Sequence, residues 1–181
     1  RHLWTSVRPN GDDRPHDLNR IELRICDLIA DPLELLAVTA FAELRLLQLL
    51  AEPGRFDPLL TSDLSPEDLA DLADANDRAA ARSSLEAELR HWKTGAPILA
   101  RDWIAAELES LAPLAQSLGL ENLLPPLEML LTRGNTAMRW LALQRTGQPV
   151  AEIVAAEAAA LEARETALEA CLATDSAHAL G

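Results

Sequence analysis

The chain has 181 residues, of which 49% are hydrophobic and 25% charged, and its formal net charge is −13. This length suits one domain with its own core, and the composition excludes a wholly disordered chain. The acidic excess argues against a protein that binds nucleic acid through the phosphate backbone. No charge-free apolar run is long enough to cross a membrane.

Two strands are predicted at the start of the chain. Apolar and polar residues alternate over residues 3–8, and a Pro-Asn-Gly turn follows. Residues 20–27 alternate more strictly: one face carries Ile21, Leu23 and Ile25, and the other carries Glu22, Arg24 and Cys26. The linker at residues 12–19 is longer than a tight hairpin needs, so it is either a solvated loop or a flap over a site.

Helices are predicted for most of the remaining chain. The first should start at Asp31-Pro32, where a capping residue precedes a proline, and run to about Ala51. Few polar residues interrupt it, so we expect it to be covered on most sides and to pack on the Ile21, Leu23 and Ile25 face. Residues 55–63 are predicted to form a loop.

Further helices are expected at about residues 65–76, 77–93, 97–119, 121–133, 136–146 and 149–173. Pro113 should kink or split the helix that contains it. The predicted fold class is therefore α+β and mostly α, with two N-terminal antiparallel strands followed by a cluster of about six or seven helices.

Common catalytic motifs are absent from the sequence. The four histidines form no zinc-binding pattern, no serine or cysteine lies in a Gly-flanked nucleophile turn, and no phosphate-binding glycine loop occurs. The four tryptophans are expected to pack in the core or in grooves. Cys26 and Cys171 lie far apart and match no metal or redox motif, which predicts a reducing, cytoplasmic setting.

The remaining candidates are Arg8, Glu22, Arg24 and Asp27. Phosphoryl transfer needs a carboxylate for a divalent cation that bridges ATP phosphates, and a guanidinium for the negative charge of the transferred group. Glu22 and Arg24 would stand about 7 Å apart along one strand face, a suitable reach for one ion and one phosphate. An edge strand with one solvated face, or a structural Glu22–Arg24 ion pair, gives the same pattern.

The segments VRPNG at residues 7–11 and IELRICD at residues 21–27 resemble the VRP…(I/L)E(V/L)R..D signature of glutamate–cysteine ligases and related carboxylate–amine ligases. Residues 3–11 and 17–20 are most similar to the cyanobacterial type. So are the segments ARDWI at residues 100–104 and GNTAM at residues 134–138.

The resemblance implies a glutamine-synthetase-like catalytic sheet and an ATP-dependent reaction. Glutamate would be activated as an acyl phosphate at its γ-carboxylate, and the cysteine amine would attack it to give γ-glutamylcysteine, the first step of glutathione biosynthesis. By position, Glu22 matches a magnesium ligand, Arg24 an ATP-phosphate contact, and Arg8 a motif arginine near substrate or nucleotide. Asp27 closes the motif and is expected to cap the turn into the next helix, whereas Cys26 is expected to pack.

The resemblance further implies that the chain corresponds to about the second half of such an enzyme. Residues 1–27 would be its active-site strands and loop, 28–173 a helical scaffold, and 174–181 a frayed tail. Its partners would be glutamate, cysteine and the N-terminal half of the same enzyme, and the isolated segment is expected to be inactive. Two alternatives remain: a noncatalytic helical interaction module, and a carboxylate–amine ligase that uses another amine.

Overall fold

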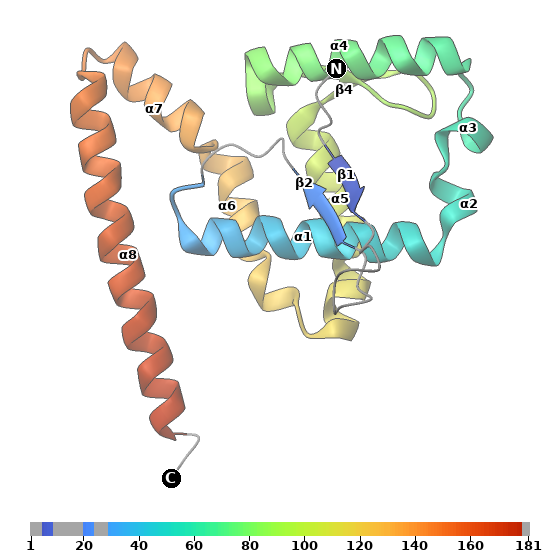
Figure 1. Cartoon of the computed structure of the whole chain (residues 1–181). Helices are drawn as coiled ribbons and strands as arrows, with labels where there is room; N and C mark the ends of the chain where they lie inside the picture. The colour runs from blue at the N-terminus through green and yellow to red at the C-terminus, as the bar shows by residue number, and fades with distance from the viewer. Residues whose placement is uncertain (1–4, 9–19, 24–28, 179–181) are drawn as a thin grey trace.

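The computed structural model describes the backbone at residues 5–8, 20–23 and 29–178, and the side chains of Leu23 and of residues 29–170 (Figure 1). The predicted fold class is confirmed, because this part of the chain is mostly helical with short antiparallel strands. Its elements are β1 (Thr5–Arg8), β2 (Arg20–Leu23), α1 (Pro32–Ala51), α2 (Pro53–Phe56), α3 (Pro58–Thr61), α4 (Pro66–Ser83), β3 (Glu88–Arg90), β4 (Pro97–Leu99), α5 (Ala100–Leu118), α6 (Pro125–Arg133), α7 (Thr136–Arg145) and α8 (Val150–His178). Two 3₁₀ turns, η1 (Ser84–Glu86) and η2 (Glu121–Leu123), flank the β3–β4 hairpin and α5.

Short-range capping explains where several helices begin. The Asp31 carboxylate accepts a hydrogen bond from the backbone N–H of Leu33 at 2.9 Å, and Pro32 occupies the first helical position of α1. The Ser65 hydroxyl caps α4 in the same way, and the Asn135 side chain caps α7. Gly119 ends α5 with a φ of 69°, a left-handed conformation that glycine adopts without strain. The predicted starts of α1, α4 and α7 are therefore confirmed.

Two separate helices were predicted at residues 65–76 and 77–93, and this prediction was wrong in two respects. The helix α4 runs unbroken to Ser83, and residues 88–99 form the antiparallel hairpin β3–β4 instead. The Asn76 side chain bonds both the backbone N–H and the carbonyl of Arg90, each at 2.8 Å. Asn76 therefore fastens the hairpin to α4 and does not end a helix.

Four smaller predictions also differ from the structure. The segment 55–63, predicted as a loop, contains part of α2 and all of α3. Pro97 lies in β4, and α5 begins only at Ala100, whose N–H continues the hairpin by bonding the carbonyl of Ala87 at 2.9 Å. Pro113 does not split α5, which runs through it to Leu118, whereas the predicted kink stays a prediction. The helix α8 continues to His178, beyond its predicted end near residue 173.

The rings of the β3–β4 hairpin pack against α5. The centroid of the His91 ring lies 5.0 Å from that of Trp103 and 5.6 Å from that of Trp92. Such contacts are typical of aromatic packing. For Trp92 and Trp103, the observed contacts are of the packing kind that was predicted.

The core lies where α1 meets α5 and α6. Leu44 of α1 and Leu111 of α5 are completely buried. The small side chains of Ala37, Ala40 and Ala115 lie in the same cluster and allow the helices to approach closely. The cluster also contains further leucines, from η1, from α5, from the residue that follows η2, and from α6: Leu85, Leu108, Leu124, Leu127, Leu130 and Leu131.

The prediction that α1 is covered on most sides was wrong. Only Ala37, Ala40 and Leu44 of this helix are buried. Five of its leucines are between 38% and 73% exposed: Leu33, Leu35, Leu36, Leu47 and Leu50. The main packing partners of α1 are α5 and α6, not the strand β2, whose Leu23 is 46% exposed. Ile25, expected on the same strand face, lies outside the described residues.

Ion pairs attach the C-terminal helices to the N-terminus of α1. The Arg139 guanidinium of α7 donates to both carboxylate oxygens of Glu34, at 2.9 and 3.1 Å. Arg164 of α8 lies 3.4 Å from the Asp31 carboxylate and donates to Glu157 at 2.9 Å. The indole N–H of Trp140 also donates to Glu157. Figure 1 shows α8 as a long helix along one side of the molecule.

We expect the stability that Glu157 contributes to the fold to be lost in acid. The hydrogen bond from Arg164 lowers the pKa of Glu157, and the same bond raises the pKa of Arg164. A carboxyl group with a lowered folded-state pKa stabilises the fold above its unfolded pKa, and this contribution is lost as the pH falls through the folded-state value. When the pH falls from about 5 to 3, the free energy of unfolding of the Glu157→Gln variant should therefore decrease less than that of the natural chain. The expected difference is only about 0.5–1 kcal/mol, because the Arg164–Glu157 pair is partly exposed. Urea denaturation at several pH values measures this, and parallel pH profiles for the two proteins would contradict it.

Candidate active site

The strands β1 and β2 pair antiparallel, as predicted. Their backbone register places Thr5 opposite Leu23, Ser6 opposite Glu22, Val7 opposite Ile21, and Arg8 opposite Arg20. Arg8 is therefore a diagonal neighbour of Glu22, and such positions lie about 7–8 Å apart. The register thus brings together two of the predicted site residues, which the sequence separates by 14 positions.

Other predicted site residues lie outside the described part of the chain. These are Arg24, expected at the ATP phosphates, and Asp27, expected to close the motif. Cys26 and the linker at residues 9–19 also lie outside it. The functional roles of Arg8, Glu22, Arg24 and Asp27 stay predictions.

The register adds Arg20, a residue to which the sequence analysis gave no role. Arg8 and Arg20 are direct cross-strand partners, and like charges at such positions destabilise a strand pair. A bound phosphate would remove this repulsion, because guanidinium groups bind phosphate oxygens well. The alternation of residues 20–27 could have drawn attention to Arg20, because Arg20 falls on the same strand face as Glu22 and Arg24. The residue opposite Arg20 on β1, however, is known only from the strand register.

The donor types present suit magnesium that is shared with a nucleotide. Among the residues that the structure describes, no three His, Cys, Asp or Glu residues are grouped closely enough to hold a metal ion. Protein sites for Mg²⁺ commonly supply only one or two carboxylates, and water and substrate phosphates complete the six ligands. Glu22, with the hydroxyl residue Ser6 at the partner position, offers donors of this kind.

The fold and the strand pair together define an α+β protein whose polar strand residues are of the types that bind metal and phosphate. The model of glutamate-cysteine ligase family 2 (GCS2) matches residues 1–168, which include both strands and most of the helices. The chain therefore belongs to this family, and membership implies a ligase of the glutamate–cysteine ligase type. A search of curated proteins found no match, and a search of solved structures found none either.

The helices were also compared with the requirements for spanning a membrane. Within the described residues, none of them combines enough length with enough apolar character to cross a lipid bilayer.

Proposed function

We propose that the chain is part of an ATP-dependent ligase that joins the γ-carboxylate of glutamate to the amine of cysteine. The observation that carries the proposal is the register that places Arg8 beside Glu22 in a chain of this family. The proposed roles are magnesium binding for Glu22, and binding of ATP phosphate for Arg24 and Arg8. We add Arg20 as a further phosphate-binding residue because it is the cross-strand partner of Arg8.

The chemistry has two steps. An oxygen of the glutamate γ-carboxylate attacks the γ-phosphorus of ATP, the bond to the bridging oxygen breaks, and ADP leaves. The cysteine amine then attacks the acyl carbon, phosphate leaves, and the amine loses a proton to give γ-glutamylcysteine. Arginines held at the transferred phosphoryl group offset its negative charge without reorganisation during the reaction. Magnesium held by Glu22 would contribute further charge neutralisation.

The proposal includes a division of labour along the chain. Residues 1–27 would supply active-site groups, and residues 28–173 would be the scaffold that supports them. The N-terminal half of the enzyme would supply further metal ligands and the two substrate pockets. A cytoplasmic location fits this chemistry, because free cysteine stays reduced there.

We expect the 181-residue chain alone to form no detectable γ-glutamylcysteine. A pair of short strands offers one metal-binding carboxylate, which is too little to hold ATP and two further substrates. The test compares this chain with the longer enzyme in ATP, glutamate and cysteine, with the product measured by mass spectrometry and phosphate release measured in parallel. Product formed by the 181 residues alone would contradict this expectation.

The same assay decides between the proposal and its alternatives. Phosphate release by the longer enzyme with glutamate and another amine, but not with cysteine, would identify a carboxylate–amine ligase of different specificity. Absence of phosphate release with every amine tried, from a protein shown to be folded by circular dichroism, would favour the noncatalytic interaction module.

A further inference from the structure

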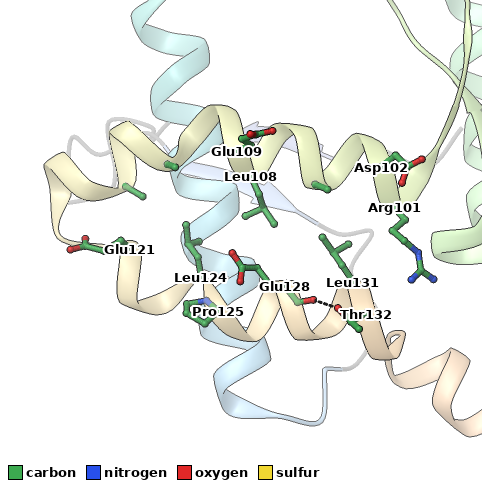
Figure 2. A pocket seen from close by; sticks show the side chains of 13 residues that line it. Arg101, Asp102, Leu108, Glu109, Glu121, Leu124, Pro125, Glu128, Leu131 and Thr132 are labelled. Atoms are coloured by element: carbon green, nitrogen blue, oxygen red, sulfur yellow. Dashed lines mark hydrogen bonds between the residues drawn. The ribbon is translucent and has the colours of Figure 1, made fainter.

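A groove of about 790 Å³ runs between α5 and α6 (Figure 2). Its base is apolar, with the buried side chains of Leu108, Leu124 and Leu131. On the α5 wall the residues at positions 105, 108, 112 and 115 follow one helix face, and three of these four are alanines. Ten residues of α-helix measure about 15 Å, so the groove follows α5 for about three turns.

Acidic side chains surround this apolar base. Asp102 and Glu109 come from α5, Glu121 comes from η2 and Glu128 comes from α6, and all four line the groove. In Figure 2, Glu128 lies between the two helices, Asp102 and Glu109 lie on the outer edge of α5, and Glu121 lies at one end. Asp102 and Glu109 are seven positions apart on α5, or about 10 Å along that helix, whereas Glu121 and Glu128 belong to two successive elements. The α5 wall and the η2–α6 wall therefore contribute two carboxylates each.

These four carboxylates lack partners within the described residues, since none of them makes an ion pair or a side-chain hydrogen bond there. Elsewhere on the same helices and their neighbours, acidic side chains are neutralised: Glu107 pairs with Arg45, and Glu34 pairs with Arg139. The single cation that lines the groove, Arg101, is bound to Glu86. The negative charge around the groove is therefore uncompensated locally.

We propose that this groove binds an amphipathic helix of a partner protein, about three turns long, with an apolar stripe flanked by lysines or arginines. A third helix fits between two helices when small residues let the axes approach to about 8–10 Å. Ala105 and Ala112, both exposed, provide that space. Apolar residues of the partner at i, i+3, i+4 and i+7 would cover the base, and its cations would face the four carboxylates.

A second copy of this chain is a poor occupant. Each copy carries a net charge of −13, so association on an acidic rim is opposed by repulsion. Among the described helices of more than two turns, only α7 has basic residues without acidic ones. Its Arg139 is already bound to Glu34.

The test uses the purified chain and a fluorescent amphipathic peptide of about 18 residues, long enough to be helical, with leucines on one face and lysines beside them. Fluorescence anisotropy should show saturable binding that weakens with added salt. The double variant Glu109→Lys, Glu128→Lys should weaken binding at least about tenfold. The matched control Glu162→Lys, Glu165→Lys makes the same change in net charge on exposed positions of α8, outside the groove, and should bind nearly as tightly as the natural chain.

A second peptide with glutamates in place of the lysines separates charge from apolar attraction. It should not bind measurably. Equal binding of both peptides, or equal binding of the lysine peptide by the Glu109/Glu128 variant and the natural chain, would overturn the proposal. So would a concentration-dependent dimer in analytical ultracentrifugation that Ala112→Trp abolishes, because the groove would then belong to a second copy. Circular dichroism of each variant confirms that it is folded.

Discussion

If the proposed function holds, replacement of Arg24 by alanine in the proposed longer ligase should lower kcat for γ-glutamylcysteine synthesis by about 100-fold or more. A preorganised cationic donor at developing charge is worth about 3–4 kcal/mol in the transition state. The negative charge moves during phosphoryl transfer, so the loss should fall mainly on kcat, with a smaller rise in KM for ATP. Steady-state phosphate release at varied ATP concentration measures both quantities.

The comparison needs two further variants. Arg82→Ala removes an exposed arginine of α4 and should leave turnover within about twofold of the natural enzyme, since an exposed surface change has little effect. Arg20→Ala, which removes the cross-strand partner of Arg8, should give an intermediate loss. Unchanged turnover of Arg24→Ala would remove Arg24 from the mechanism, whereas unchanged turnover of Arg20→Ala alone would remove only the role that we added from the register.

Leu111→Ala should be among the most destabilising single changes in the helical scaffold. The Leu111 side chain is 0% exposed and lies in the cluster formed by α1, α5 and α6. Truncation of such a leucine leaves a cavity and costs about 3–5 kcal/mol, a large share of the stability of a domain of this size. Urea denaturation followed by far-ultraviolet circular dichroism measures the free energy of unfolding.

Leu118→Ala is the matched control, because it makes the same chemical change in the same helix at a side chain that is 48% exposed. Its cost should stay below about 1 kcal/mol. If Leu111→Ala fails to fold, Leu111→Met keeps the volume and should cost less than about 1.5 kcal/mol. Equal losses for Leu111→Ala and Leu118→Ala would mean that this cluster is not the core of the protein.

The parts of the fold that depend on neighbouring residues could be predicted from the sequence. Asp31 with Pro32, and Ser65 with Pro66, mark helix starts because the cap and its acceptor lie within three residues. The β3–β4 hairpin could not be predicted in this way. Asn76 holds Arg90 from 14 positions away, and a helical pattern of apolar residues hides that contact. The exposed leucines of α1 were missed because periodicity shows which face is apolar, but not what covers it.

In the candidate site, too, local features could be predicted from the sequence and long-range pairings could not. The alternation at residues 20–27 predicted a strand, and the expected strand pairing is present. The role proposed for Glu22 came from the family resemblance and not from the alternation. The register that pairs Arg8 with Arg20 could not be predicted, since it depends on the length and conformation of the linker between the strands. The acidic groove was missed for a similar reason, because Glu109 and Glu128 come from separate helices that only the tertiary fold brings together.

Pro113 has a consequence for that groove. Proline has no N–H, so the carbonyl of Glu109, four residues earlier in α5, lacks the donor that an α-helix normally supplies. The same residue thus offers two acceptors to an incoming lysine, which are its side-chain carboxylate and its backbone carbonyl oxygen. One wall of the groove therefore keeps an acceptor that replacement of the Glu109 side chain does not remove, and binding of the lysine peptide to the Glu109→Ala variant would measure how much this acceptor contributes.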